Sequence, residues 1–233
     1  MRDIEELISD LTDQLSVNEV FNLPILGGLG INESVVITWG IMAFWIIVGF
    51  ILTRNLRVEN PSKRQLILEV CYTKLYGVFD EIIGKNGRRY IPYLMSVALY
   101  LGTANILGIF GFKPPTKDLN VTIALAVMSI ILIEYSGIHK LGLKGWLKSF
   151  TQPVVIITPI NILEIFIRPF SLCLRLFGNV LGAFIIMELI KIVVPIAVPV
   201  AASLYFDIFD GLIQAYVFVF LTSLYIREMV ADE

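Results

Sequence analysis

An arginine stands inside an otherwise apolar stretch of this chain of 233 residues, in the segment SLCLRLFGNV at 171–180. Arg175 has a leucine on each side, and no charged side chain follows it before Glu188. Placing an arginine at the centre of a bilayer costs about 2.5–3.5 kcal/mol on insertion scales. Since ionisable groups kept at such a cost generally serve an ion path or an ion pair, Arg175 is the first candidate functional residue.

Further polar side chains recur at helical spacing in the same apolar context. Asn179 lies four residues after Arg175, so both are on one face of a helix. Asp207, Asp210 and Gln214 are spaced by three and then four residues, which makes one polar stripe on an apolar helix. The stripe predicts an ion path. The alternative is that Asp207 lies near the outer interface and is simply hydrated.

Four more polar residues are candidates for the same path. Asn105 lies within an apolar run, and Asp118 and Asn120 stand at the start of another. The latter two could instead be helix caps. Glu164 lies four residues before Arg168, in the order that favours an ion pair along one helix. Such a pair accounts for the presence of Glu164 at least as well as a role in ion transfer.

Motifs of soluble enzymes are absent from the sequence, which contains no P-loop, no HExxH and no GxSxG. Cys71 and Cys173 do not have the spacing of a metal site or a disulfide framework. We therefore expect no cofactor, no metal and no catalytic activity from this chain alone. Gly178 and Gly182 are four residues apart, a pattern that lets another helix approach closely.

Long apolar runs must carry these residues. The chain is 57% hydrophobic and 16% charged, whereas a soluble domain is closer to half apolar and a quarter charged. A helix of about 20 apolar residues spans a hydrocarbon core about 30 Å thick. The sequence predicts an all-α integral membrane protein, one polytopic domain over 1–233, with transmembrane helices at 34–53, 90–112, 119–138, 152–192 and 200–226.

Two segments depart from a simple span. The fourth run is twice the necessary length, so either its helix is strongly tilted or its first third lies at the interface. Pro153, Pro159 and Pro169 could bend it, because proline lacks an amide hydrogen. The segment 61–84 is interrupted by charges and predicts an amphipathic helix on the membrane surface. Its apolar residues recur at helical spacing as Leu66, Val70, Leu75, Val78 and Ile82.

Basic residues are concentrated in two of the connecting segments, the predicted loop 139–149 and the segment 54–89. They are Arg54, Arg57, Lys63, Arg64, Lys74, Lys85, Arg88, Arg89, Lys140, Lys144 and Lys148. Among the first 33 residues, Arg2 is the only basic one. Because cytoplasmic loops carry an excess of lysine and arginine, we expect the N-terminal segment 1–33 outside and the C-terminus in the cytoplasm. This pattern and the compact chain suit the plasma membrane of a bacterium.

Four separated stretches resemble one family. They are RPFSLCLRLFGNVLGAF at 168–184, GLIQAYVFVFLTSLYI at 211–226, PTKDLNVTIALAV at 115–127 and TPINILEIFIRP at 158–169. In this order, they resemble subunit a of the F-type ATP synthase, and the resemblance runs from about residue 30 to the C-terminus. The core SLCLRLFGN is highly specific.

The resemblance implies a membrane stator beside a rotating ring of c subunits. Its long fourth and fifth helices would form a hairpin against this c-ring, and Arg175 would be the essential arginine between two offset half-channels for ions. The implied partners are the c-subunit ring, b-type peripheral stalk subunits, the rest of the synthase and membrane lipid, with no nucleic acid. Whether the ion is H⁺ or Na⁺ stays open.

Individual positions acquire roles by the same resemblance. Gln214 would lie beside the arginine and orient it, and Glu164 suits the inner half-channel. The outer half-channel would take Asn179, Asp207, Asn105, Asp118 and Asn120, with Asp210 on the same stripe. Phe184 stands where many members carry Glu or His, and Gly108 where some carry an acid. Asp207 is therefore predicted to be the main titrating group of the outer path.

Three other functions are compatible with a membrane protein of this kind. A secondary transporter would require broken helices and an internal repeat, and we see no repeat in the sequence. A non-conducting scaffold would use Arg175 only for assembly. A membrane-embedded enzyme would need a nucleophile or a metal cluster, which the sequence does not offer.

Overall fold

Among the residues that the structure describes, five helices are long and apolar enough to cross a membrane. The computed structural model describes residues 19–23, 29–110, 112–151, 155–193 and 197–230. The helices are α2 (Glu33–Thr53), α4 (Ile91–Ile106), α5 (Leu119–Ser149), α6 (Thr158–Val193) and α8 (Gly211–Val230). Short turns η1 (Lys85–Tyr90) and η2 (Leu107–Phe110) extend α4, while α7 (Ala197–Ser203) and η5 (Leu204–Asp210) lead into α8. The predicted all-α membrane fold is confirmed.

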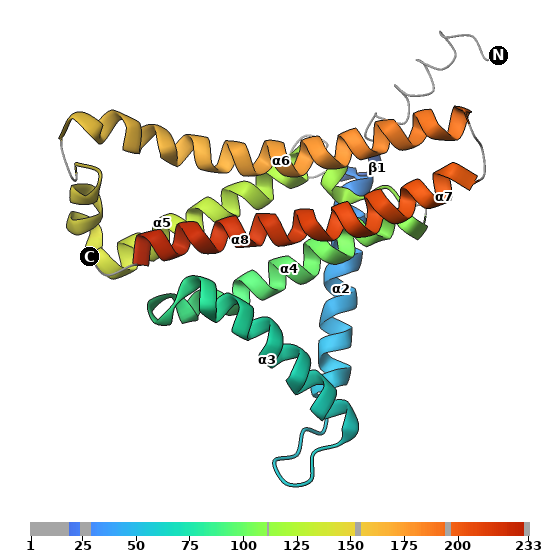
Figure 1. Cartoon of the computed structure of the whole chain (residues 1–233), viewed down its shortest axis with the longest axis horizontal. Coiled ribbons are helices and arrows are strands. Elements are labelled where there is room, and N and C mark those ends of the chain that lie inside the picture. Colours follow the sequence, from blue (N-terminus) through green and yellow to red (C-terminus); the bar gives the residue numbers. More distant parts are fainter. Residues whose placement is uncertain (1–18, 24–28, 111, 152–154, 194–196, 231–233) are drawn as a thin grey trace.

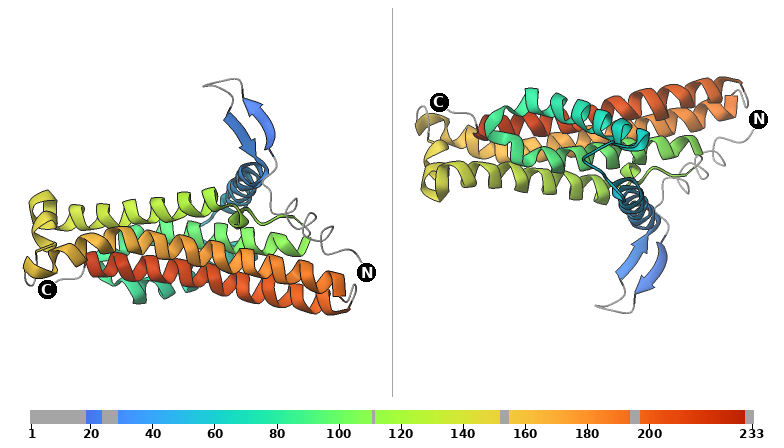
Figure 2. Two further views of the ribbon diagram at one scale, coloured as in Figure 1. Left: turned by 90° about the horizontal axis from the view of Figure 1, so that it is seen from above. Right: turned by 90° about the horizontal axis from the view of Figure 1, so that it is seen from below.

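The helix α6 and the continuous run of α7, η5 and α8 lie side by side and antiparallel (Figure 1). The helix α5 packs against both α6 and α8, and α4 packs against α8. By contrast, α2 stands at a steep angle to these helices, at the edge of the bundle, where it contacts α4 and η3 (Figure 2). The core between the helices is apolar, with Leu101, Ile133, Leu172, Phe218 and Ile226 all buried.

The helix α6 is longer than one membrane span requires. Its 36 residues form one helix, which at 1.5 Å per residue is about 54 Å long against a hydrocarbon core of about 30 Å. Such a helix either inclines steeply or extends into the interface, so both alternatives for the fourth apolar run stay predictions. It begins at Thr158, after the turn η4 (Val155–Ile157), and continues through Pro169. Pro153 lies outside the described residues.

The helix α5 continues well past the predicted end at residue 138. The segment 139–149, expected to be a loop, is helical apart from a break at Gly142, where φ is 69° and ψ is 164°. Glycine is needed there, because this backbone conformation is essentially closed to other residues. After the break the chain turns back, so that Trp146 Nε1 donates a hydrogen bond to Glu134 Oε2 at 2.8 Å. The lysines of this segment are therefore held on an ordered helical turn.

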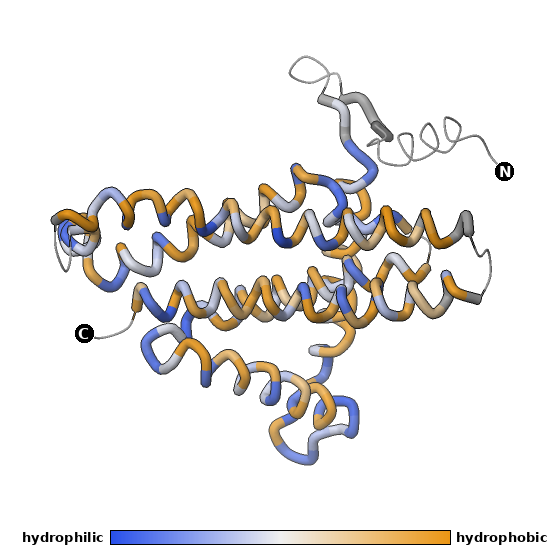
Figure 3. Tube along the Cα trace, turned by 45° about the horizontal axis from the view of Figure 1, so that its top comes forward, coloured by the Kyte–Doolittle hydropathy of each residue, from blue (hydrophilic) through white to orange (hydrophobic). Residues whose placement is uncertain are grey.

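The helix α3 (Lys63–Ile83) occupies the segment predicted to be amphipathic. Ser62 caps it by accepting a hydrogen bond from the amide of Gln65. The buried residues are Phe79 and Ile83, whereas Leu66, Val70 and Val78 of the predicted apolar face are exposed in the isolated chain. Only the C-terminal half packs on the bundle, because α3 diverges from it toward residue 63 (Figure 3).

An ion pair joins Asp80, near the C-terminal end of α3, to Arg88. Arg88 Nε donates to Asp80 Oδ1 at 2.6 Å, and Arg88 Nη2 donates to Asp80 Oδ2 at 2.7 Å. These hydrogen bonds from Arg88 lower the pKa of the Asp80 carboxyl below its ordinary value. The pair therefore ties α3 to the turn η1 that begins the second span.

The N-terminal segment contains an antiparallel hairpin of two short strands, β1 (Glu19–Leu23) and β2 (Leu29–Asn32), which the sequence analysis did not predict. Asn32 Nδ2 donates a hydrogen bond to Asp118 Oδ2 at 3.2 Å. The hairpin is thus tied to the start of α5. The rest of the predicted outer segment, 1–18, lies outside the described residues.

Candidate functional site

Arg175 lies on an exposed side of α6. Within the described part of the chain, its guanidinium forms no hydrogen bond and no ion pair. Apolar side chains are also exposed on the same helix, including Ile167, Phe170 and Leu174. The charge therefore stands unpaired on an apolar surface.

The glycines of the small-residue pattern face the same open side. A Cβ atom added at Gly178 or Gly182 would meet no atom within 4 Å, apart from the backbone of its own helix and its chain neighbours. The pair therefore packs against no other helix in the described ranges. This leaves space for the close approach of a helix from another chain.

The amides of Asn179 and Gln214 join α6 to α8. Asn179 Nδ2 donates to Gln214 Oε1 at 2.6 Å. Gln214 is only 3% exposed, and its Nε2 is buried with no hydrogen-bond partner among the described residues. The resemblance placed Gln214 beside Arg175 as its orienting residue, but the hydrogen bond of Gln214 goes to Asn179 instead.

A cavity of about 370 Å³ lies next to this pair. Four predicted pathway residues line it, namely Asn105, Asp207, Asp210 and Gln214, together with Lys113 and Phe184 among others. Lys117 Nζ stands 3.5 Å from the centre of the Phe184 ring. The structure thus brings the polar stripe of the fifth span to one cavity with Asn105 of the second span.

Both acids of the cavity lie on η5, which is a π-helix. A Cβ atom at Gly108 would lie 2.7 Å from Asp207 Oδ1, so a larger residue there would displace this carboxylate from its present position. Position 108, where some family members carry an acid, is thus filled by the carboxylate of Asp207 from the opposite helix.

Asn105 connects three segments through buried hydrogen bonds. Its Nδ2 donates to the carbonyl oxygen of Gly211 at 2.8 Å, and its Oδ1 accepts from Thr116 Oγ1 at 3.0 Å. Thr116 lies on the turn η3 (Pro115–Lys117) and is fully buried. Sequence reasoning missed Thr116, because a threonine between a proline and a lysine reads as an ordinary loop residue.

Asp118 and Asn120 have the geometry of a helix cap. Asp118 Oδ1 accepts from the backbone amide of Asn120 at 2.9 Å at the start of α5, and Oδ2 accepts from Asn32. Asp118 is 3% exposed, while Asn120 is exposed and does not line the cavity. This is the capping alternative considered above, and their part in an ion path stays a prediction.

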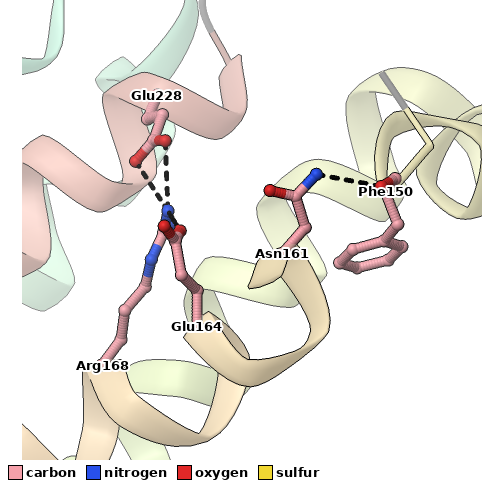
Figure 4. Close-up of polar contacts among 5 residues, drawn as sticks. All are labelled: Phe150, Asn161, Glu164, Arg168 and Glu228. Atoms are coloured by element: carbon pink, nitrogen blue, oxygen red, sulfur yellow. Dashed lines mark hydrogen bonds and ion pairs between the residues drawn. The ribbon is translucent and has the colours of Figure 1, made fainter. Parts of the chain in front are cut away.

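Glu164 belongs to an ionic cluster at the other end of the helix pair (Figure 4). Arg168 Nη2 donates to Glu164 Oε2 at 2.6 Å and contacts Glu228 of α8 at 3.1 Å. The Arg168 side chain is 12% exposed and its guanidinium lies over the Tyr225 ring, 4.8 Å from the centroid. The predicted pair of Glu164 and Arg168 is present, and Glu228 is a member that sequence spacing could not reveal.

The described residues contain no group of three or more His, Cys, Asp or Glu side chains that could hold a metal ion. Both cysteines are free thiols, with Cys71 exposed and Cys173 buried. The described residues offer a fixed cation, Arg175, on the surface of α6, and two carboxylates, Asp207 and Asp210, in a cavity beside it on the adjoining helix.

Comparison with known proteins identifies the family of this chain. The family model described as ATP synthase A chain matches residues 35–227. An ATP synthase subunit a of Moorella thermoacetica is 39% identical over 213 residues, covering 91% of this chain and 95% of that protein. One of Bradyrhizobium sp. is 35% identical over 89% of this chain and 92% of its own length.

A third relative carries a more specific name. The sodium ion specific ATP synthase subunit a of Propionigenium modestum is 30% identical over 221 residues, covering 88% of this chain and 76% of that protein. The resemblance noted in four sequence stretches thus extends over most of the chain. The chain belongs to the ATP synthase subunit a family, and so to the membrane part of an F-type ATP synthase.

Proposed function

We propose that this chain presents two offset half-channels to a rotating ring of c subunits, and that Arg175 separates them and couples ion flow to rotation. The observation that carries this proposal is the exposed guanidinium of Arg175, which has no anionic partner in the described ranges. A charge left unpaired on a membrane helix calls for a partner from another chain. A carboxylate on each c subunit is that partner.

The physical chemistry of the guanidinium suits a barrier between the channels. It stays protonated in proteins, so Arg175 cannot shuttle a proton. Its charge lowers the pKa of a carboxylate that comes close, which favours release of the bound ion. Once the carboxylate has moved past Arg175, it can bind an ion again from the other side. The same charge opposes direct passage of cations between the two channels.

The cavity lined by Asp207, Asp210 and Gln214 is our candidate for the outer half-channel. It borders the Asn179–Gln214 pair, which lies one helical turn beyond Arg175. The exposed faces of α6 and α8, with the open glycines Gly178 and Gly182, form the surface for the c-ring. We place the inner half-channel near Glu164, beside the Arg168 cluster.

We further propose that α8 ends in the cytoplasm and that the β1–β2 hairpin lies outside, in the plasma membrane of a bacterium. Basic residues gather where α8 ends: Lys140 Nζ donates to the carbonyl of Val230 at 2.9 Å, and Arg227 donates to that of Ile82. Such a concentration of lysine and arginine is typical of the cytoplasmic side. The remaining partners are b-type peripheral stalk subunits and lipid.

The decisive experiment is ATP-driven ion pumping in vesicles that contain the assembled synthase. Arg175→Ala should reduce coupled pumping by about 100-fold, the scale of losing one preorganised charge. Arg227→Ala is the matched control, since it removes an arginine that hydrogen-bonds only a backbone carbonyl of α3. Normal coupled pumping by an assembled Arg175→Ala enzyme would refute the proposal.

The same vesicles identify the coupling ion. If the unsubstituted enzyme pumps only when Na⁺ is added, the coupling ion is Na⁺, as the name of the sodium ion specific relative states for that protein. Pumping that persists without Na⁺ and collapses with a protonophore would identify H⁺.

A further inference from the structure

We propose that Thr116 and Asn105 are positioning residues that hold the π-helix η5 in register and thereby aim Asp207 into the outer cavity. This inference rests on the proposed function, since it concerns how the outer half-channel is built. It gives Asn105 a role different from that of an ion ligand, and it adds Thr116 to the functional residues.

The hydrogen bonds form a relay from the outer turn to the start of α8. Thr116 Oγ1 donates to Asn105 Oδ1 at 3.0 Å, and Asn105 Nδ2 donates to Gly211 O at 2.8 Å. Thr116 is 0% and Asn105 is 4% exposed. Each end of the Asn105 amide is thus occupied by protein. The carbonyl of Gly211 fixes which way the amide points, because it can accept from the NH₂ group but cannot donate to the oxygen, and Thr116 then donates to the oxygen.

The relay ends where the π-helix ends. The segment η5 covers Leu204–Asp210 and Gly211 is the next residue. A π-helix closes its hydrogen bonds one residue later than an α-helix. If η5 became an α-helix, its hydrogen bonds would shift by one residue. Each residue of shift would rotate the side chains before Gly211 by about 100° around the helix axis. Asp207 would then leave the cavity that it now lines.

Two close contacts join α4 and η2 to η5 and the start of α8 in their present register. A Cβ atom at Gly211 would lie 2.8 Å from Asn105 Cβ, so the helices touch at this point. One turn further along, Gly108 leaves the space that Asp207 occupies. Asn105 and Gly108 therefore contact the chain at Gly211 and at Asp207, and these two contacts fix the C-terminal half of η5.

The first test measures the position of residue 207 directly. In the assembled enzyme carrying Cys71→Ser and Cys173→Ala, Asp207→Cys is labelled with a water-soluble methanethiosulfonate added from the outer side. Adding Thr116→Val should slow labelling about tenfold, because losing the hydroxyl leaves a buried acceptor unpaired. Adding Thr116→Ser, which keeps the hydroxyl, should leave the rate unchanged.

Thr222→Val is the matched control. Thr222 is 1% exposed, and its hydroxyl bonds only to Phe218 O of its own helix at 2.9 Å. The same loss of a buried hydroxyl there should leave labelling at position 207 unchanged. Equal labelling rates with Thr116 and with Thr116→Val would overturn the proposal, as would equal slowing by Thr222→Val.

The second test is a double-mutant cycle on ion-driven ATP synthesis per assembled complex. Because Thr116 acts through Asn105, Asn105→Leu and Thr116→Val together should be no slower than Asn105→Leu alone. Additive losses would contradict the relay. Neither result depends on Arg175, so failure of the relay can be told apart from failure of the proposed function, which the Arg175→Ala experiment decides.

Discussion

Two arginines seven residues apart on α6 have opposite surroundings. Arg168 is 12% exposed, pairs with two carboxylates and lies over an aromatic ring. Arg175 is exposed, and the described residues offer it no anion. An arginine whose charge is already compensated stabilises the fold of its own chain, whereas an uncompensated one is available to a partner. The contrast supports a structural role for Arg168 and the functional role that we propose for Arg175.

Two carboxylates on the outer side should respond differently to the same substitution. Asp207→Asn removes an ionisable group from the cavity wall and should slow ion-driven ATP synthesis by about 100-fold. Asp118→Asn should retain most of the activity, because asparagine caps a helix as well as aspartate does.

The measurement is ATP synthesis by vesicles under an imposed ion gradient, normalised to assembled complex. Near-normal rates for Asp207→Asn would refute its assignment as the main titrating group. A severe loss for Asp118→Asn would show that its charge acts in the path as well as in the cap.

At the scale of elements, the helices differ in how their interruptions are built. The π-helix η5 needs partners from α4 and η3, whereas the break in α5 needs only Gly142 and the contacts beyond it. Where a helix turns back on itself, Trp146 contacts Gly137 and hydrogen-bonds Glu134. The break thus places an indole against the C-terminal part of α5.

Gly142→Ala should destabilise this turn by about 1–3 kcal/mol, because alanine cannot adopt φ 69° and ψ 164° without strain. Gly77→Ala, in the middle of α3 with open space around it, should be neutral or slightly stabilising, since alanine favours helices. Thermal unfolding in detergent, followed by tryptophan fluorescence, compares the two. Equal unfolding temperatures for the Gly142→Ala and Gly77→Ala variants would show that alanine at position 142 does not strain the turn.

At the scale of the whole molecule, charge and hairpin geometry define two ends. The β1–β2 hairpin, Asp118 and the cavity acids lie toward one end, and the basic residues around the end of α8 lie toward the other. An inclined pair of helices between these ends can present both half-channels to one ring while keeping them apart along the membrane normal.

The proposed orientation predicts one-sided labelling of the natural thiols. Cys71 is exposed on α3 and Cys173 is buried between helices. A membrane-impermeant maleimide should therefore modify Cys71 from the cytoplasmic side only, and Cys71→Ser should abolish the signal. Modification of Cys71 from the outside of intact cells would reverse the orientation.

Hydropathy predicted the spans because each apolar run is long enough to be unambiguous. It did not predict the helical turn after Gly142, because the lysine-rich segment 139–149 has no apolar run and its order comes from contacts such as Trp146 with Glu134. The hairpin β1–β2 was not predicted from the sequence, because its strands are only five and four residues long.

For the site, spacing correctly grouped Asp207, Asp210 and Gln214, since positions three and four apart share a helix face. Spacing could not reveal the π-helix, because its wider turn depends on partners that come from elsewhere in the chain. For the same reason Thr116 and Glu228 were missed: each acts on a residue at least eleven positions away.

The unpaired guanidinium of Arg175 also bears on biogenesis. A free copy of this chain exposes that charge to lipid, at a cost of about 2.5–3.5 kcal/mol, whereas docking against carboxylates relieves it. The residue that we propose to separate the half-channels thus also makes the orphan subunit less stable in the bilayer than the assembled one. Subunits that have not found a rotor should accordingly be the ones that quality-control proteases remove.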